Sequence, residues 1–208
     1  MQIGYYQFNP EFGAKDANLG KIIKAIGVID CDLLVCPELC TTGYQFDSHS
    51  EVESLSESIP DGPTCRTLMQ TARETGKGII CGIAEKDGSH YYNSAIFAGP
   101  EGYIGRYRKI HLFDEETLWF QSGNERLRVY SFQGALVGIM ICFDWIFPEA
   151  ARSLALLGAE VICHPANLIL PYCQDAMITR AVENRVYIVT ANRWGAEERG
   201  NRSRLQFT

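Results

Sequence analysis

The sequence has 208 residues, a formal net charge of -6, 46% hydrophobic residues and 21% charged residues, which is the composition of an ordinary globular domain. It excludes a disordered, collagen-like or coiled-coil protein, and a chain of this length buries enough surface to fold without disulfide or metal cross-links. No cluster of Lys and Arg marks a nucleic-acid-binding surface. The longest apolar run, Ala135–Phe143, is too short to cross a bilayer. We expect neither nucleic acid nor a membrane as a partner.

The N-terminal residues and the cysteines indicate a cytoplasmic protein. Met1 leads directly into a strand pattern over residues 3–8, without the charged segment and cleavage site of a secretory signal. The eight cysteines lie in apolar segments, as Cys81 does between Ile80 and Gly82, and none forms a CxxC pair. A free cysteine in such a position behaves as a small hydrophobic side chain. We therefore predict reduced cysteines.

Predicted strands and helices alternate along the chain. Apolar side chains at Leu19, Ile22, Ile23 and Ile26 have helical spacing. The predicted strands cover residues 3–8, 33–36, 78–84, 91–98, 102–108, 127–132, 135–141, 161–164 and 186–191. The predicted helices cover residues 18–29, 63–75, 147–157 and 175–185, residues 78–108 are expected to be antiparallel, and residues 202–208 have the pattern of a further strand. One mixed α/β domain over residues 1–208 fits this order.

Three reactive side chains follow predicted strands: Glu38, Lys109 and Cys142. Each of them alone is equally consistent with a solvated strand end or, for the cysteine, with core packing. Together they suit acyl transfer, because a thiol at a strand end resembles a nucleophile elbow and needs a base at neutral pH. A glutamate can act as that base, and a lysine can stabilise an oxyanion. His111 or His164 could instead complete a Cys–His dyad.

Three segments carry a family resemblance: Pro37–Tyr44, Tyr107–Phe113 and Ile141–Glu149. They resemble the three signature blocks of the nitrilase superfamily, the carbon–nitrogen hydrolases, in the family's order and at comparable spacing. The resemblance continues through residues 164–167 and 180–186 and covers essentially the whole chain. It implies a four-layer α-β-β-α sandwich.

The resemblance also implies roles for particular residues. Glu38 would be the general base, Lys109 the oxyanion support and proton donor, and Cys142 the nucleophile. A second glutamate would hold the lysine; Glu116 matches its position best, and Glu115 is the alternative if the loop is shifted by one residue. The remaining residues implied are the oxyanion donor Phe143, through its N–H, and the pocket residues Tyr44, Trp145 and Asn167.

The implied reaction converts a small linear amide to a carboxylate and ammonia through a thioester, without a cofactor or metal. The sequence Cys-Phe-Asp-Trp is more similar to amidases and carbamoylases than to true nitrilases, so an N-carbamoyl amine or amino-acid hydrolase is the first alternative. An inactive family member that acts only in binding or assembly is the second. Metal-dependent hydrolysis would use Cys36, Cys40, Cys163 and His164, whose spacing resembles no zinc motif.

The resemblance has implications for assembly and for the C-terminal part. Family members usually form homodimers or larger homo-oligomers, and the predicted helices over residues 147–157 and 175–185 are candidates for that interface. Compared with the family, the sequence stops before the final strands. We therefore expect the C-terminal strands to be missing and the second sheet to have an open edge.

Overall fold

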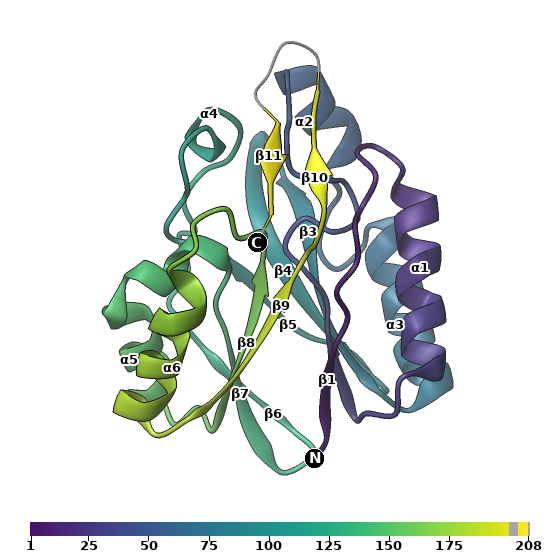
Figure 1. Cartoon of the computed structure of the whole chain (residues 1–208). Coiled ribbons are helices and arrows are strands. Elements are labelled where there is room, and N and C mark those ends of the chain that lie inside the picture. Colours follow the sequence, from purple (N-terminus) through teal and green to yellow (C-terminus); the bar gives the residue numbers. More distant parts are fainter. Residues whose placement is uncertain (200–203, 208) are drawn as a thin grey trace.

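Two β-sheets lie face to face at the centre of the molecule, with helices outside them (Figure 1). The computed structural model describes residues 1–199 and 204–207. The first sheet contains, in spatial order, β1 (Ile3–Tyr5), β2 (Leu33–Val35), β3 (Gly78–Asp87), β4 (His90–Gly99) and β5 (Gly102–Arg108). The second contains, in spatial order, β6 (Val129–Phe132), β7 (Ala135–Ile139), β8 (Val161–Ala166) and β9 (Tyr187–Asn192).

The strand directions follow from the connections between the strands. β1, β2 and β3 are parallel, because helices α1 (Lys15–Val28) and α3 (Pro63–Thr75) carry the chain back between them. β3, β4 and β5 are antiparallel, as predicted for residues 78–108. In the second sheet β6 and β7 form a hairpin, and β7, β8 and β9 are parallel. Their connecting helices are α5 (Pro148–Leu156) and α6 (Cys173–Asn184).

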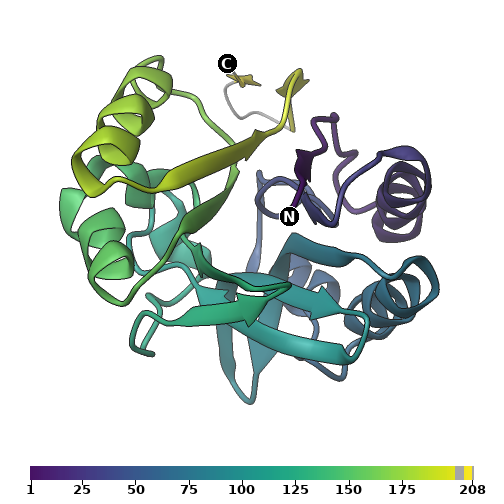
Figure 2. The ribbon, with the colours of Figure 1, turned by 90° about the horizontal axis from the view of Figure 1, so that it is seen from below.

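The alternation of side chains along the strands builds two separate cores. On β2, Leu33 and Val35 face the second sheet, whereas Leu34 faces the helices. Between the sheets the core includes Leu33 and Val137, and beneath the helices of the first sheet it includes Leu34 and Ile22. Burying a side chain of this kind contributes about 1.5–3 kcal/mol. The resulting helix–sheet–sheet–helix order, seen from below in Figure 2, is the sandwich that the resemblance implies.

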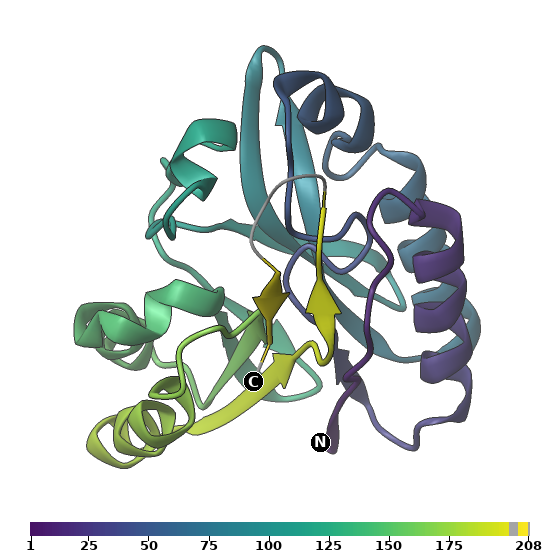
Figure 3. The same cartoon turned by 45° about the horizontal axis from the view of Figure 1, so that its top comes forward.

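The predicted order of elements is correct, but several boundaries are wrong. β1 ends at Tyr5, before the predicted residue 8, and a 3₁₀ turn, η1 (Cys142–Ile146), precedes α5. The short helices α2 (His49–Leu55) and α4 (Glu116–Trp119) and the strand β10 (Ala196–Glu197) have no predicted counterpart, because hydrophobic periodicity needs longer segments. β10 pairs with β11 (Leu205–Gln206), which lies inside the predicted strand over residues 202–208 (Figure 3). Residues 202, 203 and 208 of that predicted strand lie outside the described residues.

The helices over the second sheet leave apolar side chains exposed. Leu156 on α5 is 80% exposed, and Val182 on α6 is 72% exposed. Ile178 on α6 and Tyr187 on β9 are exposed as well.

Within residues 1–199 and 204–207, no helix combines the length and the apolar character that a membrane crossing requires.

Candidate active site

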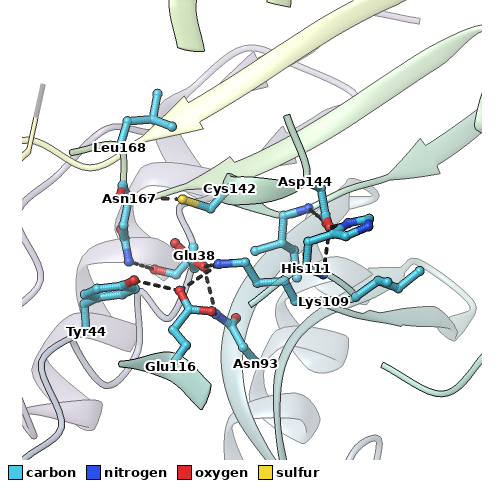
Figure 4. Close-up of polar contacts among 12 residues, drawn as sticks. Glu38, Tyr44, Asn93, Lys109, His111, Glu116, Cys142, Asp144, Asn167 and Leu168 are labelled. Carbon is cyan, nitrogen blue, oxygen red and sulfur yellow. Dashed lines mark hydrogen bonds and ion pairs between the residues drawn. The ribbon is translucent and has the colours of Figure 1, made fainter. Parts of the chain in front are cut away.

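A lysine lies between two glutamates at one end of the first sheet (Figure 4). Glu38 follows β2, Lys109 follows β5, and Glu116 begins α4. The Lys109 Nζ donates hydrogen bonds to Glu38 Oε1 at 2.6 Å and to Glu116 Oε1 at 2.7 Å. All three side chains are buried. The structure thus brings together three of the four predicted catalytic residues, and it is Glu116, not the exposed Glu115, that contacts the lysine.

Two glycines allow the loops carrying these charges to pack closely. A side chain at Gly82 on β3 would place its Cβ 2.5 Å from the Pro37 carbonyl oxygen, against the segment that carries Glu38. A Cβ at Gly123 would collide with the Arg108 carbonyl, and the Gly123 N–H donates to the Lys109 carbonyl at 2.8 Å. Both positions therefore require glycine because of close backbone approach.

Two further side chains complete the charged cluster. The Asn93 amide, on β4, donates to Glu38 Oε1 at 2.8 Å and to Glu116 Oε2 at 3.4 Å. The Lys109 N–H donates to the Asn93 carbonyl at 2.8 Å, so the same residue also holds the backbone of the lysine. The Tyr44 hydroxyl donates to Glu116 Oε1 at 2.7 Å. The family resemblance predicts Tyr44 as a pocket residue, whereas Asn93 has no counterpart among the predicted site residues.

Burial and charge act against each other in this cluster. Burial raises the pKa of Glu38; the Lys109 charge opposes this, and the Glu116 charge adds to it. Burial by itself lowers the pKa of Lys109, but the two carboxylates more than offset it, so its pKa is raised and the ammonium stays charged. Glu38 Oε2 is buried and makes no hydrogen bond within the described part of the chain. That oxygen is therefore available to accept a proton.

Cys142 approaches this cluster from the second sheet (Figure 4). It is the first residue of η1 and has a φ of 40°, a conformation that residues other than glycine rarely adopt. Its Sγ donates weakly to the Asn167 carbonyl at 3.6 Å. Burial, followed by the negative charge of Glu38, raises the pKa of the thiol well above its usual value. A base is therefore required to generate the thiolate.

Neither candidate histidine contacts the Cys142 sulfur. His111 is hydrogen-bonded through Nδ1 to Asp144 Oδ1 at 2.7 Å, and its ring stacks on Phe147. His164 is hydrogen-bonded through Nε2 to the Cys142 carbonyl oxygen at 2.9 Å. The hypothesis of a Cys–His dyad is therefore wrong in this structure, because both rings are engaged elsewhere.

The cysteines considered for a metal belong to two different cores. Cys36 and Cys40 belong to the core beneath α1 and α3, whereas Cys163 belongs to the core between the sheets. Among residues 1–199 and 204–207, no group of three or more His, Cys, Asp or Glu side chains is arranged to hold a metal ion. The spacing of these residues does not correspond to a common site.

Two adjoining cavities lead to Cys142. The outer cavity has a volume of about 430 Å³, a size usual for ligand sites. Its wall includes Tyr44, Glu116 and the exposed carboxylates Asp114 and Glu115. The inner, narrow cavity shares Phe113 and Ile169 with the outer one and is otherwise lined by Cys142, Phe143, Trp145, Asn167, Leu168 and Leu170. Of the predicted pocket residues, Tyr44 lines the outer cavity, and Phe143, Trp145 and Asn167 line the inner one.

Comparisons with known proteins agree with this architecture. The sequence model of the carbon–nitrogen hydrolase family matches residues 2–206. A protein named nitrilase from Pyrococcus abyssi is 50% identical over 96% of this chain and 77% of its own length. An (R)-stereoselective amidase from a Pseudomonas species is 35% identical over 96% of this chain and 73% of its own length.

Among solved structures, a mutant of an amidase from Nesterenkonia superposes with a TM-score of 0.83 at 25% identity, covering all of this chain and 79% of the other. Fold and site together define a hydrolase of the carbon–nitrogen hydrolase type. The chain belongs to the carbon–nitrogen hydrolase family, the nitrilase superfamily.

Proposed function

We propose that the protein hydrolyses a small linear amide to a carboxylate and ammonia through a thioester on Cys142. The observation that carries this proposal is the position of the Cys142 thiol beside a buried glutamate–lysine–glutamate cluster (Figure 4). Because the pKa of the thiol is raised and Glu38 Oε2 makes no hydrogen bond within the described residues, Glu38 is the proposed base.

In the acylation half of the reaction, Glu38 takes the proton of Cys142 Sγ as the sulfur attacks the amide carbonyl carbon. A C–S bond forms, and the carbonyl oxygen becomes an oxyanion. The Lys109 ammonium and the Phe143 N–H stabilise it, and each such donor contributes about 3–4 kcal/mol to the transition state in comparable hydrolases. Glu38 then returns the proton to the amide nitrogen, the C–N bond breaks, and ammonia leaves.

In the deacylation half, a water molecule replaces ammonia. Glu38 removes a proton from this water as it attacks the thioester carbonyl, and the C–S bond breaks to release the carboxylic acid. The proton returns to Cys142 Sγ, which restores the thiol. Glu116 fixes the lysine throughout, since it accepts one of the three ammonium protons while Glu38 accepts another.

The negative charges in the wall of the outer cavity bear on the charge of the preferred substrate. Asp114 and Glu115 are exposed carboxylates in its wall, next to the aromatic rings of Phe113 and Trp119. Carboxylates and aromatic faces attract cations and repel anions. We therefore expect neutral or cationic amides to be preferred over amides that carry a carboxylate, and an N-carbamoyl amine is the second candidate substrate. Equal release of carbon dioxide and ammonia would identify the carbamoyl reaction.

We further propose a cytoplasmic homodimer that pairs through α5 and α6. The apolar side chains exposed on these helices support the pairing. The cysteines support the location: all eight are free and buried, which suits a reducing compartment.

Intact-mass analysis of the protein mixed with small amides tests the proposed reaction. Wild type should gain the mass of the acyl group and release ammonia, whereas Cys142→Ala should do neither. Because the Pyrococcus relative is named a nitrilase, each amide is paired with the nitrile of the same carbon skeleton. Faster ammonia release from the nitriles would replace the amidase assignment with a nitrilase one. Equal labelling of wild type and Cys142→Ala would show that the nucleophile is misassigned.

A further inference from the structure

The peptide group between Cys142 and Phe143 is held by a histidine. His164 lies on β8 and is fully buried. Its Nε2 is 2.9 Å from the Cys142 carbonyl oxygen. A carbonyl oxygen can only accept a hydrogen bond, so Nε2 must carry the proton.

The other ring nitrogen fixes this tautomer. His164 Nδ1 is 3.0 Å from the hydroxyl of Thr190, its register partner on β9. Burial lowers the pKa of His164 to about 4, so the ring is neutral near pH 7 and Nδ1 has a lone pair. The Thr190 hydroxyl therefore donates to Nδ1 while Nε2–H donates to Cys142. A chain of two hydrogen bonds connects the second sheet to the carbonyl of the proposed nucleophile.

Fixing this carbonyl also fixes the neighbouring N–H. In a planar trans peptide the C=O and the following N–H point in opposite directions. Because the Cys142 carbonyl is directed to His164, the Phe143 N–H is directed away from His164. Cys142 and Phe143 both line the inner cavity, where the carbonyl of a bound amide would lie.

A second clamp holds the residue before the cysteine. Asp144 accepts a hydrogen bond from the Ile141 N–H on Oδ2 at 2.8 Å, and its own N–H donates to the Ile141 carbonyl at 3.0 Å. With Ile141 fixed on one side and the Cys142 carbonyl on the other, the positive φ of Cys142 cannot relax without breaking buried hydrogen bonds.

We propose that His164 is a positioning residue that orients the Phe143 N–H as an oxyanion donor. This inference rests on the proposed thioester mechanism. His164 does not exchange a proton with the substrate; it acts through the peptide group that it holds.

Two substitutions at the same position separate this role from a general structural one. In His164→Gln the side-chain amide nitrogen takes the place of Nε2 and can still donate to Cys142. In His164→Asn the shorter amide takes the place of Nδ1, near Thr190, and cannot reach Cys142. We expect His164→Asn to lower kcat about 10²- to 10³-fold, the usual cost of losing one oxyanion donor, with little change in KM. His164→Gln should recover most of that loss.

Thiol reactivity supplies the second measurement. Methyl methanethiosulfonate reacts with a thiol without forming an oxyanion. In His164→Asn this reagent should therefore modify Cys142 at the wild-type rate, whereas acylation of Cys142 by an amide should be slow. Thr190→Val should lower kcat less than His164→Asn, and Thr190→Ser, which keeps the hydroxyl, should match wild type. The threonine pair gives the answer even if His164→Asn does not fold.

The possible results separate the two proposals. If wild type forms no acyl-enzyme with any amide, the proposed function fails. If wild type acylates and His164→Asn acylates equally fast, the positioning role is overturned. A parallel loss of acylation and thiosulfonate reactivity in His164→Asn would overturn it too, because that result indicates a displaced thiol.

Discussion

The two halves of the site are built in different ways. The segments that follow β2 and β5 of the first sheet supply Glu38, Lys109 and Glu116, whose side chains form ion pairs at 2.6 and 2.7 Å. The second sheet supplies Cys142, which is held through its backbone by His164 and by the turn at Asp144. The charged half, formed by Glu38, Lys109 and Glu116, therefore depends on buried charges that compensate one another. The thiol half, formed by Cys142 and its turn, depends on backbone hydrogen bonds.

This difference predicts different consequences of substitution. Removing one partner from a buried ion cluster leaves a charge without compensation, which destabilises the fold. Removing the thiol of Cys142 leaves no charge behind. Both halves should be essential for turnover, but only the charged half should contribute strongly to stability.

Cys142→Ala should have the largest effect on activity and one of the smallest on stability. Loss of the nucleophile in comparable hydrolases lowers kcat by about 10⁶-fold, because no thioester can form. We expect the free energy of unfolding to change by less than about 1 kcal/mol, since only one sulfur atom is removed. Ammonia release and urea unfolding measure the two quantities. A variant that is inactive because it is unfolded would contradict the separation of the two halves.

Lys109→Met should abolish activity and also destabilise the fold. Glu38 and Glu116 would then face each other in a buried site without the cation between them, and breaking a buried pair costs about 3–5 kcal/mol. Lys86→Met is the matched control, because Lys86 pairs with Glu53 at the surface. The control should leave urea unfolding unchanged. If the two lysine variants have the same free energy of unfolding, the charged cluster contributes no more to stability than a surface ion pair does.

The sequence predicts the charged half well, apart from one residue. Glu38 comes shortly after β2 and Lys109 directly after β5, so their positions along the chain mark them as candidates, whereas Glu116 is predicted only through the family resemblance. Asn93 lies inside β4, flanked by other buried residues, and only the pairing of β4 with β5 brings it to the lysine. Nothing in the sequence around Asn93 marks it, because its role depends on a contact across the sheet.

The thiol half is predicted less completely. Cys142 stands at a strand end, but its positive φ and the 3₁₀ turn result from the surrounding hydrogen bonds. His164 looks like a candidate base in the sequence, and the structure shows it bound to a carbonyl instead. The sandwich itself is predictable because its long helices and strands have clear periodicity, whereas α2 and α4 are too short to show one.

Asn93→Ala should shift the pH dependence of activity. Burial raises the pKa of Glu38, and the hydrogen bond from Asn93 partly opposes that rise by favouring the ionised carboxylate. Without it, the pKa of Glu38 rises further, so the acid limb of kcat/KM should move to higher pH. Asn93→Ala should have a lower free energy of unfolding than wild type at pH values above the pKa of Glu38, where the carboxylate is ionised. This difference should vanish at pH values below that pKa.

Ser94→Ala is the matched control for this shift. Ser94 is equally buried on the same strand, and its hydroxyl donates to Glu85 at 2.6 Å, away from the charged cluster. It should leave the acid limb in place even if it lowers stability. An unchanged limb in Asn93→Ala would show that Glu38 is not the group whose ionisation limits the reaction.

The smallest effect on chemistry is expected at the exposed helices. α6 packs against η1, so the proposed dimer surface belongs to the thiol half. Ile178→Lys would place a charge on that surface, where Ile178 is 65% exposed, and should shift the protein toward monomer in sedimentation while changing kcat only a few-fold. Val28→Lys is the control, because Val28 is 75% exposed on α1, over the first sheet. Equal dissociation by both variants would reflect added charge alone. Dissociation by Ile178→Lys alone would show that the dimer interface and Cys142 belong to the same sheet. Dimer formation would then stabilise the half of the site that has no buried ion pairs.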